Sequence, residues 1–484
     1  MNLSNIKIGI IHSVVGKNDG VSIVIDQTIE AMIKHMGIRL GNIYSLAAHA
    51  PMRFNTTLDD IFWHNNDANR YILKYFSDRK IPSDLDAFIY ANASYAKRII
   101  EKFVHENNID LLIVHNGCHP SNFVYATAVG MFFEELRNEN KKMPLYLLWW
   151  HDSHLERTRF EKPNNIIKKY LKYIPGDFVD AIAFINSEQE KIAEKYYEKQ
   201  GKIDEKMFFK EKTVTIPNTC SVQWDWRAKM YLDDASIIAP PEDHYNKNFL
   251  EDIGLIDELK KRNKTLGNTV LLLQHTRIVH RKRIDVSIDF AFKLQKLFKE
   301  KNNPKTVALI VSGHSGDEHD EYKQHLFNYM KKKFKIQNNF SENNVILLFA
   351  EHRILPEKEV IVDKKYYRFA DVPAIIAKYG GMGTYFSEVE GYGNNLLEMI
   401  SMGLPVVINK YPVYKSDIEK LKFKLPASEN ARLPDELMEE CYKILTDIQL
   451  RNDTIINNLQ VLEKKLNHKV VAAKLTKLFQ NLFK

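Results

Sequence analysis

The stretch that decides the fold is residues 387–407, S-E-V-E-G-Y-G-N-N-L-L-E-M-I-S-M-G-L-P-V-V. Glu390 and Glu398 stand on either side of a Gly-Tyr-Gly-Asn-Asn turn, and an apolar helical pattern accompanies the second glutamate. The Gly-Leu-Pro-Val-Val segment that follows is typical of a buried strand. Two carboxylates, a flexible glycine loop and a helix N-terminus together predict a ligand site.

The bulk properties are those of a globular protein with more than one core. The chain has 484 residues, 44% hydrophobic and 27% charged, so two domains are expected. No apolar run approaches the ~20 residues that span a bilayer, and the N-terminus does not resemble a signal peptide. Three widely spaced cysteines argue against a disulfide framework, which predicts a cytoplasmic protein. The net charge of +7 does not indicate a nucleic-acid partner, whereas contact with a membrane surface stays open.

Strand-like and helical segments alternate along both halves of the chain. Such repeated βα units predict an α/β fold of two doubly wound domains that face each other across a cleft. We expect one domain over residues 1–235, a second over 236–455, and a C-terminal helix over 456–484 that can cross back to the first domain. A polar segment near residues 224–247 is the expected linker. The strands are expected at residues 6–11, 109–115, 145–150, 181–185, 270–273, 307–311, 345–349 and 404–408.

Four cations follow an expected strand in residues 274–283, Q-H-T-R-I-V-H-R-K-R. A helix is expected to begin directly afterwards, and cations at a helix N-terminus are unfavourable unless an anion binds there. We therefore favour a phosphate site here over a solvated basic loop.

Glu398 has two interpretations. With Asn395 it fits a helix-capping box, in which it would reach back to the Asn395 amide. Alternatively, its carboxylate accepts hydrogen bonds from the two vicinal hydroxyls of a ribose. In that case the glycines of the turn bring backbone N–H groups close to a sugar or phosphate. A nucleotide diphosphate sugar would satisfy both the carboxylate and the cations.

Polar residues also follow the strands of the first half. His151 and Asp152 directly follow one expected strand, and residues 115–119, H-N-G-C-H, begin at the end of another. His115, His119, His151 and His154 therefore raise a metal site as an alternative, although their spacings fit no standard zinc motif. The glycine loop over residues 16–20 has neither the dinucleotide nor the P-loop fingerprint, so it is equally consistent with a plain βα turn capped near Asp19 or Gly20.

Together these segments resemble the retaining glycosyltransferases of family 4, which have the GT-B fold of two Rossmann-like domains. Residues 390–398 match the family's E-x7-E motif, and residues 403–407 match its following strand. Residues 276–282 resemble the family's phosphate-binding Arg and Lys, which are five positions apart. Residues 19–22, 151–152 and 216–218 resemble N-terminal motifs, but Asp19 and Thr219 replace glycines and His280-Arg281 replaces small or acidic residues. Residues 274–285 and 409–412 further resemble a subgroup that makes glycosides of small soluble acceptors such as glucosylglycerate.

The resemblance implies a role for each matching residue. Arg277 and Lys282 would neutralise the diphosphate, and Glu398 would hold the ribose. His151 would touch the sugar, and Gly20 would allow close approach to phosphate or acceptor. Glu390 would position the hydroxyls of the donor sugar and, with Arg277, Lys282 and His151, is an expected catalytic residue. The remaining donor-binding residues are Gly391, Tyr392, Gly393, Asn394 and Asn395. The implied reaction is transfer of a hexose from a nucleotide diphosphate sugar to a hydroxyl acceptor with retention, without cofactor and without metal.

Other functions stay open at this stage. A GT-B sugar phosphorylase would keep the phosphate-binding pair but use a sugar 1-phosphate, and a non-catalytic protein would bind the nucleotide or sugar without consuming it. A metal hydrolase would use the four histidines, and a dehydrogenase lacks its glycine fingerprint. The nucleotide base, the sugar, the linkage, the oligomeric state and the acceptor, whether small molecule, glycan or lipid-linked, are not determined.

Overall fold

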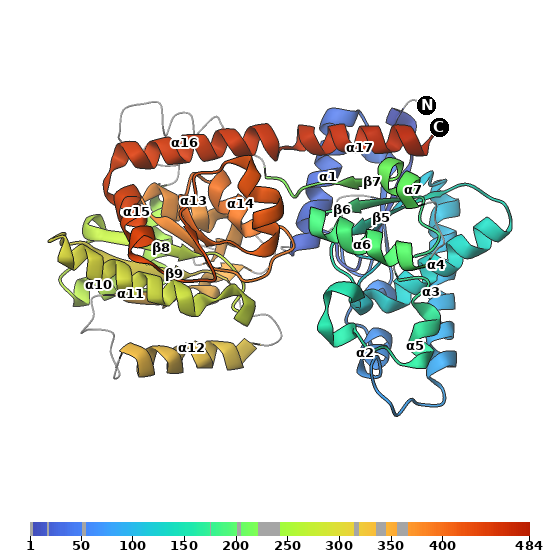
Figure 1. Ribbon diagram of the computed structural model, residues 1–484, viewed down its shortest axis with the longest axis horizontal. Coiled ribbons are helices and arrows are strands. Elements are labelled where there is room, and N and C mark those ends of the chain that lie inside the picture. The colour runs from blue at the N-terminus through green and yellow to red at the C-terminus, as the bar shows by residue number, and fades with distance from the viewer. Residues whose placement is uncertain are drawn as a thin grey trace. The chain divides into compact units, whose positions relative to one another are not determined.

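The computed structural model describes residues 3–16, 19–50, 55–174, 176–200, 205–220, 243–313, 319–334, 345–355 and 366–484. The chain forms two compact units (Figure 1). The first comprises Met1–Thr219 together with His468–Lys484, and the second comprises Cys220–Asn467. The boundary expected at residues 235 and 236 lies outside the described residues, as does most of the expected linker.

The first unit is built on a parallel sheet of seven described strands in the order β3-β2-β1-β4-β5-β6-β7. Since the chain runs outward in both directions from β1 and β4, the sheet is doubly wound. The strands are β1 Ile8–Ile11, β2 Ile43–Ala47, β3 Asn55–Leu58, β4 Leu111–His115, β5 Leu145–Trp150, β6 Ala181–Phe184 and β7 Thr213–Thr215.

Helices cover both faces of this sheet, and alternate strand residues supply the two cores. Leu112 and Leu148 pack in one core, with side chains from α3 and α4, whereas Leu111 and Leu147 pack in the other, with α1 and α17. The helix α17, at the C-terminal end of the chain, thus belongs to the first unit and packs beside α1 (Figure 1). The helices are α1 Gly20–Met36, α2 Asp67–Lys74, α3 Leu85–Asn107, α4 Phe123–Asn138, α5 Asn165–Tyr170, α6 Ser187–Gln200, α7 Glu205–Glu211 and α17 His468–Leu482.

The second unit has a parallel sheet in the order β10-β9-β8-β13-β14-β15 and a small pair, β11-β12. The strands are β8 Thr269–Gln274, β9 Thr306–Val311, β10 Ile346–Phe349, β11 Ile354–Leu355, β12 Tyr367–Arg368, β13 Met382–Tyr385, β14 Val406–Asn409 and β15 Ala427–Ser428. The helices are α9 Asp243–Asp252, α10 Leu255–Lys261, α11 Ile284–Glu300, α12 His319–Phe334, α13 Val372–Lys378, α14 Asn394–Ser401, α15 Asp435–Thr446 and α16 Ile448–Lys465.

Strand order decides which loops meet at the carboxyl edge of each sheet. In the second unit β8 pairs with β13, so the loop after β8 and the loop after β13 emerge side by side. In the first unit β4 lies between β1 and β5, so the residues that follow these three strands converge in the same way. Such edges are where doubly wound sheets bind ligands.

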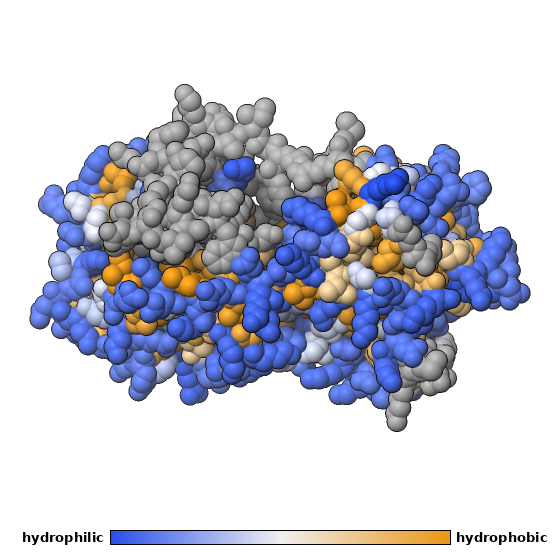
Figure 2. Space-filling view, turned by 90° about the horizontal axis from the view of Figure 1, so that it is seen from above, coloured by the Kyte–Doolittle hydropathy of each residue, from blue (hydrophilic) through white to orange (hydrophobic). Residues whose placement is uncertain are grey.

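The prediction of doubly wound parallel sheets is confirmed, and each expected strand overlaps a real one. Seven of the described strands were not predicted, namely β2, β3, β7, β11, β12, β13 and β15. The face of the molecule in Figure 2 is mostly hydrophilic, with scattered apolar residues. Among the described residues, no helix combines the length and apolarity that a membrane span requires.

Candidate active site

The loop after β8 carries the predicted cations into the carboxyl edge of the second sheet. It ends in a short 3₁₀ turn, His280–Lys282, and Arg283 then adopts a left-handed conformation with φ 48° before α11 begins. This turn buries the Lys282 side chain, which is 5% exposed, whereas Arg277 lies exposed on the loop. Only a partner of opposite charge makes such a buried ammonium tolerable.

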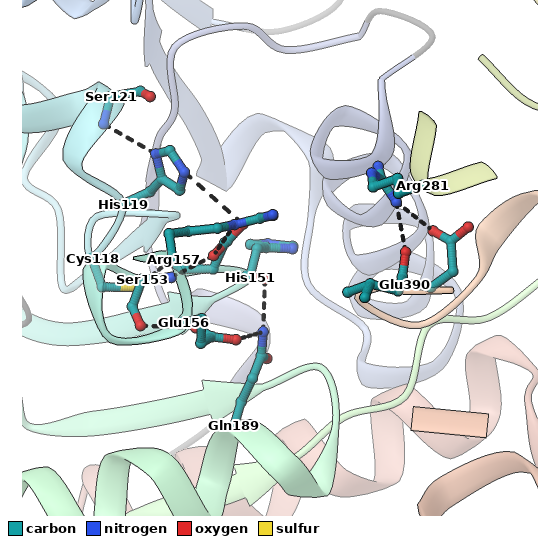
Figure 3. A network of polar contacts seen from close by, with 12 residues as sticks. Cys118, His119, Ser121, His151, Ser153, Glu156, Arg157, Gln189, Arg281 and Glu390 are labelled. Atoms are coloured by element: carbon teal, nitrogen blue, oxygen red, sulfur yellow. Dashed lines mark hydrogen bonds and ion pairs between the residues drawn. The ribbon is translucent and has the colours of Figure 1, made fainter. Parts of the chain in front are cut away.

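That partner is Glu390, from the loop after β13. Its carboxylate, 8% exposed, forms an ion pair with Lys282 through Oε1 and lies 3.2 Å from Arg281 Nη1 through Oε2. Arg281 also donates a 2.8 Å hydrogen bond to the Val389 carbonyl, which fixes the guanidinium beside the loop (Figure 3). The structure therefore joins Lys282 and Glu390 directly, with Arg281 as a second cation that sequence reasoning had not assigned to the site.

Burial and charge shift both members of this pair. Burial lowers the pKa of Lys282 to about 8, although Glu390 beside it acts in the opposite direction. Burial by itself raises the pKa of Glu390. The positive charges of Lys282 and Arg281 lower it more strongly, so that the pKa of Glu390 is about 2. At neutral pH the site is therefore a charged cluster with two cations and one carboxylate.

The glycine turn between the two glutamates has little freedom. Gly393 has φ 114° and is the N-cap of α14, and a Cβ there would lie 2.4 Å from the Tyr411 hydroxyl. That hydroxyl donates a 2.7 Å hydrogen bond to the Tyr392 carbonyl. Tyr411, which follows β14, therefore holds the turn in place. The turn requires glycine at this position, and the start of α14 is fixed as a result.

Glu398 lies one turn into α14 rather than at its cap. The alternative of a capping box is wrong, because Gly393 is the N-cap and the Asn395 side chain instead donates to Glu398 Oε2 at 3.3 Å. The second neighbour of that oxygen is His275 Nε2 at 3.6 Å, from the first residue after β8. The Glu398 side chain is 22% exposed, so a ligand at this edge can reach it.

Three histidines lie at the carboxyl ends of the three central strands of the first unit: His115 is the last residue of β4, and His12 and His151 directly follow β1 and β5. His115 Nδ1 lies 3.0 Å from His151 Nε2, and the His12 ring nitrogen lies 3.3 Å from the His115 carbonyl. Burial lowers the pKa of His151 to about 3 and that of His12 to about 4. His151 is therefore a neutral imidazole held by its neighbour, and Gln189 fixes its backbone through a 2.7 Å hydrogen bond (Figure 3).

The neighbours of His151 form a network of hydrogen bonds and ion pairs. Asp152 pairs with Arg157, and Glu156 accepts hydrogen bonds from Ser153 at 2.8 Å and Gln189 at 3.0 Å (Figure 3). Within the described residues, no group of three or more His, Cys, Asp or Glu side chains is placed to hold a metal ion.

The glycine loop after β1 is a capped βα turn. Asp19 is the N-cap of α1, and its Oδ1 accepts from the amides of Val21 and Ser22 at 3.0 and 3.1 Å. Gly20 is the first residue of the helix. Residues 17 and 18 of this loop lie outside the described residues, so the structure leaves the predicted role of Gly20 as a prediction.

Apart from Arg277, which lies exposed on the loop after β8, the predicted residues divide into three groups. Lys282 and Glu390 are brought into contact, while Glu398 and the turn over residues 391–395 lie on the same loop-and-helix segment. His151 and Gly20 lie in the other unit. Arg281, His275 and Tyr411 were not named as individual site residues; for Arg281 the available signal was its place in three adjacent cations, residues 281–283, and for Tyr411 nothing in the sequence linked it to Tyr392.

Comparisons with known proteins extend over nearly the whole chain. The chain is 25% identical to mannosylglucosylglycerate synthase of Thermotoga maritima over 94% of its own length and 95% of that protein. It is 27% identical to mannosylglucosylglycerate synthase of Petrotoga mobilis over 87% of its length and 86% of that protein. No family model matches the chain.

Solved structures share the fold. A trehalose-phosphate synthase from Burkholderia vietnamiensis superposes with a TM-score of 0.60 at 10% identity, over 99% of both chains. A glycosyltransferase from Rickettsia africae superposes with a TM-score of 0.55 at 13% identity, again over 99% of both chains. At such identities the solved structures support only the fold. The two mannosylglucosylglycerate synthases, which match nearly the whole chain, support the class of reaction. The chain is a glycosyltransferase with the two Rossmann-like domains of the GT-B fold.

Proposed function

We propose that the chain is a retaining, metal-independent hexosyltransferase that uses a nucleotide diphosphate sugar. Both curated relatives are named for mannosylglucosylglycerate, so we further propose mannose as the transferred sugar and glucosylglycerate, or a similar small soluble acceptor, as the substrate that receives it. This proposal also accords with the resemblance of residues 274–285 and 409–412 to enzymes that act on such acceptors.

The observation that carries the proposal is the buried pair of Lys282 and Glu390, with the partly exposed Arg281 beside it. When the bond between the anomeric carbon and the phosphate oxygen breaks, negative charge develops on the nucleoside diphosphate. Two fixed cations at a strand's carboxyl end stabilise that charge without reorganisation, which is electrostatic catalysis. Glu390 keeps Lys282 protonated despite its burial, and the same cations can serve in place of a metal.

Proton balance needs no further residue. The acceptor hydroxyl attacks the anomeric carbon from the side on which the leaving group departs, and the departing phosphate oxygen takes the hydroxyl proton. Arg277 is proposed as an additional diphosphate contact, His151 as a contact to the donor sugar, and Glu398 as the group that holds the ribose. The turn over residues 391–395 would place its amides against the donor.

The test is an assay of the purified protein with UDP-, GDP- and ADP-hexoses, with glucosylglycerate as acceptor. We expect one of these donors to be consumed, an α-linked donor to give an α-linked product by NMR, and EDTA to leave the rate unchanged. Loss of activity in EDTA that Mg²⁺ or Mn²⁺ restores would rule out metal independence. Activity with a hexose 1-phosphate alone would instead identify a phosphorylase, and donor binding without consumption across acceptors would identify a binding protein.

A further inference from the structure

His275 is a buried histidine that the proposed chemistry does not yet use. It is the first residue after β8 and is 0% exposed. Its Nδ1 lies 2.9 Å from the Ser312 hydroxyl, and its ring stacks on Phe369 with centroids 3.8 Å apart and planes inclined by 14°. The ring is thus held on one edge by a hydrogen bond and on one face by an aromatic ring.

The remaining ring nitrogen of His275 points at Glu398. Within the part of the chain that the structure describes, Nε2 has no hydrogen-bond partner, and Glu398 Oε2 lies 3.6 Å away. A buried polar nitrogen without a partner is costly, roughly 1–3 kcal/mol, and such groups in native proteins call for an explanation. A small movement of the Glu398 carboxylate would bring this pair within hydrogen-bond distance.

The neighbours of the ring fix which nitrogen carries the proton. If Nε2 had no proton, its lone pair would face a carboxylate oxygen in a buried setting, which is repulsive. The favourable arrangement has the Ser312 hydroxyl donating to Nδ1 and Nε2–H directed at Glu398. The imidazole then acts as a fixed donor to the carboxylate.

The two contacts of Glu398 both reach one of its oxygens. Asn395 Nδ2 lies 3.3 Å from Oε2, and His275 Nε2 lies 3.6 Å from the same atom. Among the described residues no contact to Oε1 is found, and the side chain is partly exposed. The contacts found among the described residues therefore hold the carboxylate through one oxygen.

We propose that His275 is a positioning residue that orients Glu398 for recognition of the ribose hydroxyls of the nucleotide. This inference rests on the proposed function, since it takes the ligand of Glu398 to be a ribose. When the hydroxyls bind, the carboxylate moves onto Nε2–H, so that the unpaired nitrogen and the ligand are satisfied together. Ser312 and Phe369 hold the imidazole so that this donor is in place before the nucleotide arrives.

The test compares affinity for a nucleoside diphosphate with that for its 2′-deoxy form. The nucleotide is whichever of UDP, GDP and ADP binds the wild-type protein most tightly by calorimetry. Hydrogen bonds to a charged group contribute roughly 1.5–3 kcal/mol, so the wild type should prefer the ribonucleotide by about tenfold or more. Glu398→Ala should abolish that preference.

Variants of His275 then separate positioning from structure. His275→Phe keeps the stack on Phe369 and removes the donor. His275→Asn keeps a partner for Ser312 but cannot reach Glu398. Both variants should reduce the preference for the ribonucleotide over its 2′-deoxy form at least about threefold. His275→Gln places an amide near the Nε2 position and should restore most of it. The matched control is His468→Phe, because His468 is also buried and its Nδ1 also lies 3.6 Å from a glutamate, Glu30, in the first unit. The control should leave the preference unchanged.

The outcomes distinguish the inference from the function on which it rests. If Glu398→Ala leaves the preference intact, the ribose role proposed for Glu398 is wrong, and the inference is overturned with it. If Glu398→Ala removes the preference but His275→Phe and His275→Asn retain it in full, the ribose role stands and the positioning role of His275 is refuted. Should His275→Phe fail to fold, His275→Asn decides by the same ratio.

Discussion

At the scale of single residues, the site depends on the buried ion pair of Lys282 and Glu390. The charge of Lys282 changes near neutral pH. Burial lowers the pKa of Lys282 to about 8, so its positive charge is lost as the pH rises through that value. A bound diphosphate would favour the charged form and raise that pKa again. The free enzyme and the complex should therefore respond to pH differently.

We expect kcat/KM for the donor to fall as the pH rises through about 8, whereas kcat should fall only at higher pH. Lys282→Arg should remove the fall in kcat/KM, because an arginine stays protonated throughout this range. Lys293→Arg, an exchange on the exposed side of α11, is the control and should keep the wild-type profile. A wild-type profile that stays level to pH 9.5 would contradict the assignment.

The partner of Lys282 should matter for stability as well. Glu390→Gln leaves a buried ammonium uncompensated, which costs roughly 3 kcal/mol of unfolding free energy. The double variant Lys282→Met/Glu390→Gln should recover much of that loss, since no charge then remains buried between the two loops. Urea unfolding midpoints measure both.

The control for that cost is an exposed carboxylate with the same kind of partners. Glu429 pairs with Lys410 and Lys415 and has a side chain that is 54% exposed, so Glu429→Gln should shift the urea midpoint much less than Glu390→Gln does. If Glu390→Gln and Glu429→Gln prove equally mild, the Lys282–Glu390 pair is not buried in solution as it is in the structure.

At the scale of elements, the turn that begins α14 decides where Glu398 lies. Gly393→Ala should reduce donor affinity and stability, because the new Cβ meets the Tyr411 hydroxyl and the residue is held at φ 114°. Gly393→Ala/Tyr411→Phe should recover part of the loss by removing the obstructing oxygen. Thermal shift with and without the nucleotide measures both effects.

A second glycine isolates the conformational part of that cost. Gly37 ends α1 at φ 72°, and a Cβ there would meet no atom within 4 Å. Gly37→Ala should therefore cost only the roughly 1–2 kcal/mol of a left-handed L-residue and leave donor affinity unchanged. Equal effects of the two substitutions would mean that contact with Tyr411 does not shape the turn.

At the scale of the whole molecule, the first unit is completed by the last helix of the chain. In α17, Leu475 is 0% exposed and packs in the same core as Ile25 and Ile29 of α1. Leu475→Ala should destabilise this unit by about 2–5 kcal/mol. Hydrogen exchange should then speed up in β1 and α1 before it changes in β8.

The control substitution is Leu450→Ala, in α16 of the second unit, where the side chain is 36% exposed and its truncation should cost less. Faster exchange in β8 with β1 unaffected would be incompatible with α17 as part of the first unit.

Prediction from the sequence worked where the signal was local. Buried parallel strands such as residues 145–150 form continuous apolar runs. The E-x7-E motif can be recognised because both glutamates lie within nine positions of sequence. It missed β13, the strand that delivers Glu390, because Met-Gly-Thr-Tyr is not a continuous apolar run. One of its two interpretations of Glu398 also placed the cap of α14 at Asn395, since residue type alone does not show that Gly393 has a positive φ.

The sequence by itself determined the alternation of strands and helices, the glycine turn and the run of cations, because each is set by near neighbours along the chain. The tertiary structure alone decided that Lys282 and Arg281, rather than Arg277, contact Glu390 across 108 and 109 positions of sequence. It also decided that His275 faces Glu398 and that α17 completes the first unit. The physical reason is that strand order and burial determine which side chains share a sheet edge, and neither is encoded in local spacing.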